Sequence, residues 1–417
     1  MTVAGRGAGA RADQRADPAE LLAAYRRGDF FLSTAERSIL ARGADTVLDG
    51  DDIDGLDTRL SQALTGAAHP VAVGVLPFAT GATGATGAAG GEPGEERAVA
   101  RFVLPRELWT AEPAHGAAAQ RATRGVPVPA EVTPFPAPEG HRAAVQRALA
   151  ALDESDLRKV VLARALDISF TAEVDPACLL HNLVRDNTGG YTYAVELPRA
   201  AAGSPGPPGQ RSLVGASPEL LVRRSGTLVS AHPHAGSAPR SSDADVDRRN
   251  AEALLGSAKD HAEHAMVTEA VVAALRPLCR RIDVPPEPSL MSTSTMWHLG
   301  TAITGELRDE GISALRLAAA LHPTPAVCGT PTPAARLLVG ELEPFERDYY
   351  AGAVGWVDTT GDGEWAVAIR CAQVAERSLR LYSGGGIVAG SDPDAELAET
   401  SAKFQTLLRA MGLDLNL

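Results

Sequence analysis

The chain contains very little lysine and few aromatic residues. Three of its 417 residues are lysines and 36 are arginines, while aromatic residues make up 4%. Arginine stays protonated at any useful pH, whereas a buried lysine can lose its proton and act as a base or a nucleophile. Each lysine retained in this arginine-rich chain is therefore either a candidate for chemistry that arginine cannot perform or a neutral surface substitution.

Paired cysteines, long apolar runs and net positive charge are also missing. No apolar run approaches the roughly 18–20 residues of a membrane-spanning helix, and the N-terminal tail lacks the apolar segment of a signal peptide. The formal net charge of −13 argues against a nucleic-acid-binding surface. These absences predict a soluble, cytoplasmic protein without membrane or nucleic-acid partners. The cysteines are widely spaced without a CxxC pair, which favours reduced thiols over a zinc or disulfide framework: Cys178, Cys279, Cys328 and Cys371.

The domain organisation follows from composition. With 45% hydrophobic and 22% charged residues, the chain has a globular composition and enough length for a real core. Residues 1–17 are predicted to form a disordered tail, and residues 18–417 a single domain. Glycine, proline and small residues predict flexible loops over residues 80–96 and 198–211, each of which connects two strand-like runs.

Strands and helices do not alternate strictly along the chain. Apolar residues at helical spacing predict one helix over residues 246–278, and Asp392 with Pro393 predicts the N-cap and first position of another. The expected class is therefore α+β, with large antiparallel β-sheets flanked by helices. The strand-like runs are short, β-branched and bounded by turn residues: VVLARALDISF, YTYAVEL, SLVGASPELLVRR, TLVSAHP, AGAVGWVD, EWAVAIRCAQVA and SLRLYSGGGIV.

Two charged residues lie at the ends of predicted strands. Lys159 begins a strand in which it shares one face with Val161 and Ala163. It is either a solvated edge lysine or a base pointing into a pocket. Glu219 follows Gly-Ala-Ser-Pro between two strand-like runs, so it is either an exposed turn residue or a carboxylate aimed by a bend.

Two further glutamates lie on predicted helices. Glu263 is four residues from Lys259, and Glu399 is four residues from Lys403. Ordinary ion pairs one helical turn apart explain both patterns, and Lys259 is expected to support Glu263 in this way. The functional alternative is that both carboxylates present oxygen to a hard cation such as Mg²⁺. The neighbouring histidines do not form the HExxH pattern of a zinc site.

The ordered motifs of the chain resemble those of the chorismate-utilising enzymes, which include anthranilate, aminodeoxychorismate, salicylate and isochorismate synthases. The resemblance covers residues 18–417, with 18–125 less typical and 126–417 dense in motifs. It implies an α+β fold like that of anthranilate synthase component I, with chorismate as the substrate. The motifs, in order, are KVVLAR, GASPELL, HAGSAPR, AKDHAEHAMVTEA, TMWHLGTAITG, ALHPTPAVCGTP, ELEPFERDYYAGAVGW, GEWAVAIRC, GGGIV and AELAETSAKF.

Two details of the motifs narrow the resemblance within the family. The stretch HPTPAVCG is of the isochorismate type, and Ala235 stands where aminodeoxychorismate synthases carry a nucleophilic lysine. The resemblance therefore implies a monomeric isochorismate synthase of the siderophore (2,3-dihydroxybenzoate) branch, without a glutaminase subunit. A salicylate synthase, an isochorismate supply for menaquinone and an inactive relative with a binding role remain alternatives. His234 is unusual for the family and receives no role.

The resemblance also implies roles for individual residues. Water adds at C2 of chorismate and the C4 hydroxyl leaves, with Lys159 taking the proton of the water and Glu219 protonating the leaving hydroxyl. Glu263 and Glu399 hold Mg²⁺ against the ring carboxylate, and Arg370 binds the enolpyruvyl carboxylate. The full set of expected substrate contacts is Gly236, Ser237, His298, Ala326, Arg370, Gly384 and Lys403.

Overall fold

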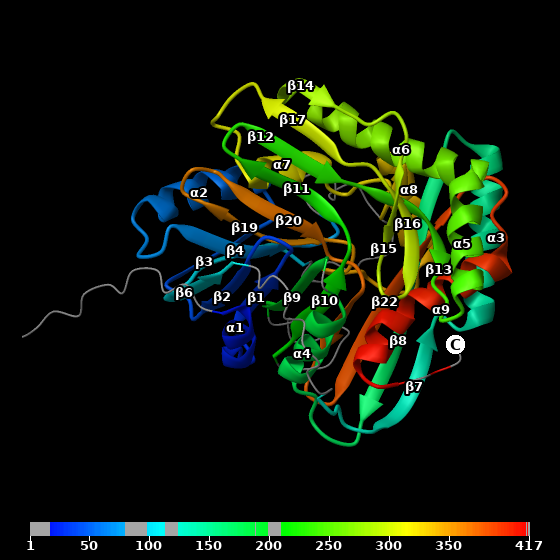
Figure 1. Ribbon diagram of the computed structural model, residues 1–417, viewed down its shortest axis with the longest axis horizontal. Coiled ribbons are helices and arrows are strands. Elements are labelled where there is room, and N and C mark those ends of the chain that lie inside the picture. The colour runs from blue at the N-terminus through cyan, green and yellow to red at the C-terminus, as the bar shows by residue number, and fades with distance from the viewer. Residues whose placement is uncertain are drawn as a thin grey trace, which may run out of the picture.

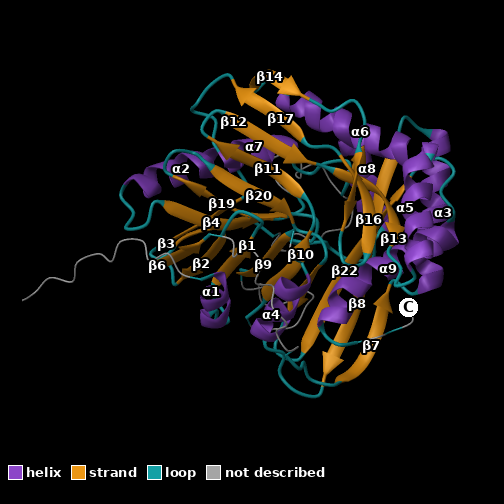
Figure 2. Cartoon of the chain, viewed as in Figure 1, coloured by secondary structure: helices purple, strands orange, loops and turns teal. Residues whose placement is uncertain are grey.

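In the computed structural model, the described residues form two large antiparallel sheets and a small third sheet, with flanking helices (Figures 1 and 2). The predicted tail and the predicted loops at 80–96 and 198–211 lie almost entirely outside the described residues. Within the described part of the chain, no helix is long and apolar enough to cross a membrane. The structure describes residues 17–79, 98–112, 124–187, 189–198, 210–413 and 415.

The larger sheet has ten strands in the described residues, and its long central strands lie beside the site described below. It runs in the order β18 (Gly329–Thr330), β8 (Lys159–Phe170), β22 (Ser378–Ile387), β21 (Cys371–Val374), β10 (Ser212–Ser217), β9 (Tyr191–Glu196), β1 (Phe30–Ser33), β2 (Ser38–Arg42) and β6 (Glu107–Ala111), with β7 (Pro129–Phe135) also paired to β8. All of these pairings are antiparallel.

The other two sheets have nine and three strands in the same part of the chain. The nine-stranded sheet has the order β14 (Cys279–Asp283), β17 (Ile303–Leu307), β12 (Leu228–His232), β11 (Leu220–Ser225), β20 (Gly363–Val367), β19 (Ala353–Asp358), β4 (Val71–Leu76), β5 (Ala100–Leu104) and β3 (Thr46–Gly50). The small sheet is β13 (His234–Pro239), β16 (Met296–Gly300) and β15 (Ser289–Ser292).

Helices cover the outer faces of the sheets. They are α1 (Pro18–Ala24), α2 (Ile53–Thr65), α3 (Pro138–Glu154), α4 (Pro176–Asp186), α5 (Ala244–Gly256), α6 (Ala258–Leu275), α7 (Ala314–Leu321), α8 (Thr332–Leu342) and α9 (Pro393–Ala410). Figure 1 shows α3, α5, α6 and α9 gathered on one side of the molecule, beside β8, β13 and β22.

The predicted α+β class with large antiparallel sheets is confirmed, and every strand-like run contains strand, although the run over residues 212–224 is two strands, β10 and β11, which separate at Pro218 and Glu219. Asp392 caps α9 by accepting hydrogen bonds from the backbone N–H groups of Asp394 and Ala395, as its position before Pro393 predicted. The strands on either side of each predicted loop pair directly, β4 with β5 and β9 with β10. Each of the two loops therefore connects neighbouring antiparallel strands.

Two predicted elements were too long. The helix predicted over residues 246–278 is two helices, α5 and α6, because Ser257 is extended (ψ 107°) and its hydroxyl caps α6 by accepting from the Asp260 N–H. The strand-like run over residues 364–375 is also divided, into β20 and β21, which belong to different sheets. Both runs keep their apolar pattern across the break, so periodicity alone could not reveal it.

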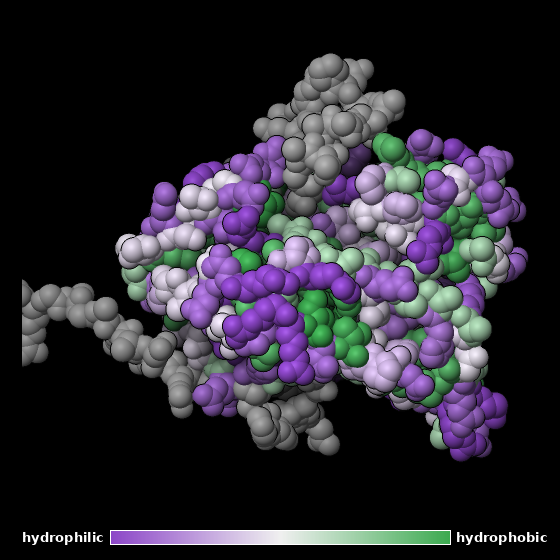
Figure 3. Space-filling view, turned by 90° about the horizontal axis from the view of Figure 1, so that it is seen from above, coloured by the Kyte–Doolittle hydropathy of each residue, from purple (hydrophilic) through white to green (hydrophobic). Residues whose placement is uncertain are grey.

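The surface of the described residues carries no large apolar face. Figure 3 shows small groups of hydrophobic residues (green) set among hydrophilic ones (purple) on the face that it draws. The exposed large hydrophobic side chains lie on five separate segments: Val47, Val128, Leu228, Leu255 and Leu337. Isolated exposed apolar side chains of this kind are normal on a globular protein.

Candidate active site

Two of the places where the chain crosses between the large sheets are adjacent. The first crossing, from β10 to β11, passes through Glu219, and the second, from β20 to β21, passes through Arg370. The two crossings are bonded to each other: Val367 N–H donates to the Glu219 carbonyl (3.1 Å), and Ala216 N–H donates to the Arg370 carbonyl (3.0 Å). Arg370 has a φ of +50°, a left-handed conformation uncommon outside glycine. Glu219 and Arg370 therefore lie on neighbouring, hydrogen-bonded crossings between the two sheets.

Lys159 is buried rather than solvated. Its side chain is 1% exposed at the start of β8, and its Nζ lies 2.8 Å from Oε1 of Glu263 on α6. The adjacent strand β22 has Gly386 at this point, where an added Cβ would collide with the Glu263 carboxylate. Glycine in β22 therefore lets α6 bring its carboxylate to the lysine, and the edge-lysine alternative is wrong.

Glu219 is held in its protonated form by its surroundings. The residue is 3% exposed, and burial raises the pKa of its carboxyl to about 8. A hydrogen bond from the His234 backbone lowers this pKa to a smaller extent, as do three nearby positive charges: Lys159, Arg370 and Lys403. At neutral pH this carboxyl carries a proton, so it can donate one to a bound molecule.

The α9 residues Glu399 and Lys403 form the ion pair expected from their spacing. Lys403 Nζ lies 2.5 Å from Glu399 Oε1 and donates to the Gly384 carbonyl at 2.8 Å. Although burial acts to raise it, the pKa of Glu399 is held below its usual range by the charge of Lys403. The ammonium thus joins α9 to β22 while it neutralises the carboxylate.

Lys259 does not form the expected ion pair with Glu263. The Nζ of Lys259 lies 3.4 Å from Oε1 of Glu396 on α9. The lysine that pairs with Glu263 is Lys159. Glu396 is 2% exposed, its Oε2 has no hydrogen-bond partner, and burial together with the charge of Glu399 raises its pKa to about 7. The expected i,i+4 pair is wrong because the helix faces a second helix that carries a nearer carboxylate.

A second acidic residue near the site was also missed by sequence reasoning. Burial, followed by the charges of Glu263 and Glu399, raises the pKa of Asp260 on α6. Together with the two predicted metal ligands, Glu263 and Glu399, these two residues, Asp260 and Glu396, make four acidic side chains on α6 and α9 near the site. The available signal was spacing, since Asp260 and Glu396 each precede a predicted ligand by three residues and so lie on the same helical face.

His298 and Ser237 form a polar chain with Arg370. The Arg370 Nη2 lies 3.3 Å from His298 Nε2, and Ser237 Oγ lies 3.1 Å from His298 Nδ1. Burial, followed by the charge of Arg370, lowers the pKa of His298 well below its ordinary value, so the imidazole is neutral. No described carboxylate lies within ion-pair distance of Arg370, which leaves its guanidinium available for an anionic ligand.

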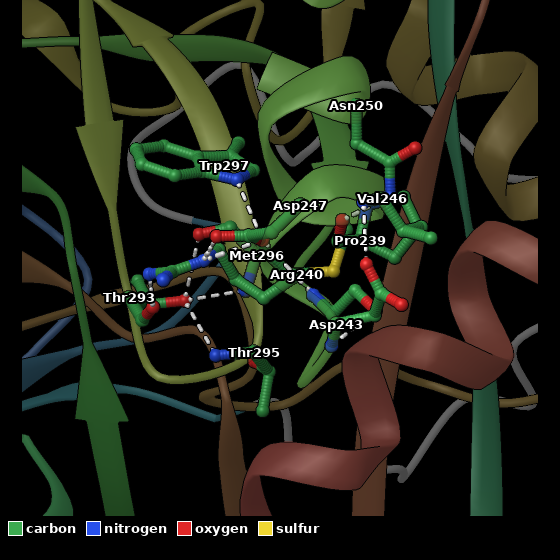
Figure 4. A network of polar contacts seen from close by, with 11 residues as sticks. Pro239, Arg240, Asp243, Val246, Asp247, Asn250, Thr293, Thr295, Met296 and Trp297 are labelled. Carbon is green, nitrogen blue, oxygen red and sulfur yellow. Dashed lines mark hydrogen bonds and ion pairs between the residues drawn. The ribbon is translucent and has the colours of Figure 1, made fainter.

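A polar network fixes the strands that carry these groups (Figure 4). Arg240, at the end of β13, donates to Oδ1 of Asp247 on α5 (2.9 Å), and Trp297 Nε1 donates to the same oxygen (3.0 Å). The Arg240 guanidinium also lies 4.4 Å from the centre of the Trp297 ring. The network joins α5 to β13 and β16, and so positions Ser237 and His298.

Ten of the eleven residues predicted from the sequence border one cavity. The eleventh, Lys159, contacts one of the ten, Glu263, at the edge of this cavity. The roles given to these residues remain predictions, but their convergence from eight different segments is a property of the fold. The ten are Glu219, Gly236, Ser237, Glu263, His298, Ala326, Arg370, Gly384, Glu399 and Lys403.

Comparison with known proteins identifies the family. Residues 106–412 match the family model described as chorismate binding enzyme. The chain belongs to this family. Isochorismate synthase DhbC of Bacillus subtilis (strain 168) is 45% identical over 94% of this chain and 96% of its own length. The vibriobactin-specific isochorismate synthase of Vibrio cholerae (serotype O1, strain El Tor Inaba N16961) is 37% identical over 94% and 93%, respectively.

A solved structure of this family has the same fold. The crystal structure of DhbC from Bacillus anthracis superposes with a TM-score of 0.85 at 41% identity, and the match covers 95% of this chain and 100% of the other. The resemblance inferred from the ordered motifs is therefore confirmed, and with it the α+β fold of the chorismate-binding enzymes.

Two aromatic residues of this chorismate-binding enzyme also line the cavity and were not predicted. Tyr350 and Tyr382 stack with their ring centres 4.9 Å apart and their planes 9° from parallel. Tyr350 lies within one quoted motif, and Tyr382 comes just before the glycine triplet of another. Position within or next to a motif was therefore the available signal for them.

Proposed function

We propose that this protein is an isochorismate synthase, which isomerises chorismate by adding water at C2 while the C4 hydroxyl leaves. The observation that carries the proposal is a buried lysine at the edge of a cavity that a protonated buried glutamate lines. Exchange of one hydroxyl for another needs a base for the incoming water and an acid for the departing group. Lys159 and Glu219 supply these two functions.

The proton transfers balance over the reaction. Lys159, acting as the base, takes a proton from the water that attacks C2, and Glu219 gives its proton to the C4 oxygen, which departs as water. One water enters and one leaves, so the product is an isomer of the substrate. Lys159 then holds an additional proton and Glu219 lacks one, and proton exchange with solvent restores both groups before the next turnover.

The remaining residues of the cavity orient the substrate. Arg370 is suited to the enolpyruvyl carboxylate, because a guanidinium binds a carboxylate through two parallel hydrogen bonds. The neutral His298, held between Ser237 and Arg370, fixes the orientation of that guanidinium. Lys403, on α9, adds a second positive charge to the lining of the cavity.

Glu263 and Glu399 are proposed to hold Mg²⁺. Each of the two glutamates has a further acidic side chain three residues earlier on its own helix, whose pKa is raised in part by a neighbouring negative charge, and this concentration of negative charge suits a hard divalent cation. No three His, Cys, Asp or Glu side chains in the described ranges are grouped closely enough to hold a metal by themselves. That agrees with Mg²⁺, which usually binds through one or two carboxylates and completes its shell with water and substrate. When bound, the ion would neutralise the ring carboxylate of chorismate.

Replacing Glu263 with glutamine tests the metal ligand. The change removes one anionic oxygen donor, so we expect the Mg²⁺ concentration for half-maximal activity to rise about tenfold or more. The measurement is initial rate against Mg²⁺ concentration at saturating chorismate. Glu269→Gln on the same helix is the matched control, since Glu269 is exposed. An unchanged Mg²⁺ requirement in Glu263→Gln would assign the metal to other residues.

The pH dependence of kcat/KM tests Glu219. This quantity reports groups of the free enzyme, and the pKa of Glu219 is raised to about 8. The acid works while protonated, so activity should persist up to about pH 8 and then fall tenfold for each further pH unit. Initial rates at roughly six pH values between 6.5 and 9.5 measure this pH dependence of kcat/KM. A profile flat across pH 8–9 would show that another group is the acid.

Ala235 supports an enzyme that works without a glutaminase subunit, since the lysine nucleophile of the aminating type is missing at that position. We place its product in siderophore biosynthesis, through 2,3-dihydroxybenzoate, in line with the vibriobactin-specific relative. The decisive experiment is chromatography of the products formed from chorismate with and without Mg²⁺. Isochorismate that forms only with Mg²⁺ supports the proposal, whereas salicylate with pyruvate would make the protein a salicylate synthase.

A further inference from the structure

Arg164 is a buried guanidinium that has no carboxylate partner among the described residues. The residue is 1% exposed on β8, and burial lowers its pKa to about 10, so it remains charged at neutral pH. Burying an unpaired charge is costly, and apolar residues in place of buried charged groups often leave a protein equally stable. Stability alone therefore does not account for an arginine at this position.

The hydrogen bonds of Arg164 to described residues all go to one turn of α9. Its Nη1 lies 3.1 Å from the hydroxyl oxygens of both Thr400 and Ser401, and 3.4 Å from the Leu397 carbonyl. The guanidinium also lies 5.8 Å from the centre of the Phe404 ring, on the next turn of the helix. A side chain of the central strand β8 thus holds α9 in one place.

The neighbouring strand β22 holds the same turn. Ser383 pairs with Arg164 in the ladder between β22 and β8, and its hydroxyl donates to the Thr400 carbonyl at 2.8 Å. Two residues further along β22, a Cβ added to Gly385 would come within 2.9 Å of Glu396 Oε2, which is closer than a side chain ordinarily packs. Contacts from two paired strands therefore fix the position of this turn.

The turn that is held in this way carries a proposed metal ligand. Glu399 directly precedes Thr400 and borders the cavity, and its Oε1 lies 2.5 Å from Lys403 Nζ on the following turn. A shift or rotation of the turn would move Glu399 relative to Glu263, which lies on a different helix. Mg²⁺ demands nearly ideal octahedral geometry, with ligands at about 2.0–2.1 Å, so such a shift would weaken its binding.

We propose that Arg164 is a positioning residue for Mg²⁺ binding, which holds in place the turn of α9 that carries Glu399; this rests on the proposed function. Arg164 acts through the hydroxyl and carbonyl groups of that turn and does not itself border the cavity. A guanidinium suits this task because its planar fork donates several hydrogen bonds in fixed directions.

Calorimetric titration with Mg²⁺ alone tests the proposal in the wild type, Arg164→Met and Arg164→Lys. Methionine supplies apolar volume without a donor, so we expect the Mg²⁺ dissociation constant to rise about tenfold, the lower end of the loss when residues that support a metal ligand are replaced. Lysine keeps the charge and one donor group, so Arg164→Lys should lose less. The Mg²⁺ concentration for half-maximal isochorismate formation should rise in parallel, while kcat at saturating Mg²⁺ falls less.

Arg336→Met on α8 is the matched control. Arg336 donates to the Phe78 carbonyl at 2.9 Å, burial lowers its pKa, and it lies outside α9 and the cavity lining. This substitution should leave the Mg²⁺ dissociation constant within about twofold of the wild-type value. Melting temperatures measured without Mg²⁺ should fall no further in Arg164→Met than in Arg336→Met, because neither guanidinium has a carboxylate partner among the described residues.

Thr400→Val tests the same contact from the helix. Valine has nearly the shape of threonine but lacks the hydroxyl that accepts from Arg164. We expect a smaller rise in the Mg²⁺ dissociation constant than in Arg164→Met, and no further rise when the two substitutions are combined, because both remove one interaction. If Arg164→Met does not fold, unchanged Mg²⁺ binding in Thr400→Val and Arg164→Lys would overturn the proposal.

Two further outcomes would also overturn it. One is a Mg²⁺ dissociation constant in Arg164→Met equal to that of the wild type, and the other is an equal rise in Arg336→Met, which would indicate general destabilisation. If the wild type forms no isochorismate with Mg²⁺, the proposed function fails. If it does form isochorismate and Arg164→Met binds Mg²⁺ as the wild type does, this inference alone fails.

Discussion

Lys159→Arg is expected to lower kcat/KM for chorismate by about 10²–10⁴-fold, the usual contribution of a positioned acid or base. Arginine keeps the positive charge and can still pair with Glu263, whose Oε1 lies 2.8 Å from the lysine Nζ. It cannot, however, give up its proton to become the base for water. The loss should therefore appear in kcat more than in substrate binding, and steady-state kinetics with product detection measures it.

The exposed neighbour Arg158 provides the matched control for this exchange. Arg158→Lys makes the reverse substitution one residue away, outside the buried start of β8, and should leave kcat/KM within about twofold of the wild type. Because the guanidinium is larger than the ammonium, Lys159→Ala should accompany Lys159→Arg, with circular dichroism to show that both remain folded. Near-normal turnover in either Lys159 variant would exclude this lysine as the base.

Glu219→Gln is expected to cause a loss of similar size, about 10²–10⁴-fold in kcat. The amide has nearly the shape of the carboxyl and is neutral, as the carboxyl is at pH 7 with its pKa raised to about 8. The variant should therefore fold and bind chorismate, yet it has no acidic proton to give to the leaving hydroxyl. Isothermal titration of chorismate together with single-turnover rates separates binding from chemistry.

Glu376→Gln, at an exposed position, is the matched control for this substitution. If Glu219→Gln keeps its turnover, the leaving hydroxyl receives its proton from another group. If it loses binding but not kcat, Glu219 holds the substrate instead of protonating it. Either result would leave the family assignment intact and change the proposed mechanism.

Local sequence patterns determined much of the fold. Asp392 before Pro393 predicted the start of α9, since capping depends on the side chain and backbone of adjacent residues. Short β-branched runs predicted strands that the structure contains, because the alternation of buried faces is a property of each strand alone. The rarity of lysine singled out three residues, of which Lys403 borders the cavity and Lys159 contacts Glu263 at its edge.

Longer elements were predicted less well, because a pattern of apolar residues does not record where the chain turns. Residues 246–278 keep helical spacing through the break at Ser257, and residues 364–375 keep strand character through the crossing at Arg370. The break in residues 364–375 is set by the tertiary structure, because β20 and β21 belong to different sheets. The chain must leave one sheet and enter the other at the point where the two meet.

The sequence by itself determined the family, the kinds of secondary structure and the residues that can carry the chemistry. Only the tertiary structure decided which charges meet: Lys159 with Glu263, and Lys259 with Glu396, one helix away from the partner that spacing suggested. It also brought the backbone of His234 to the carboxyl of Glu219. The physical reason is that pKa values and ion pairs depend on burial and distance across elements far apart in the chain, and no local pattern encodes these quantities.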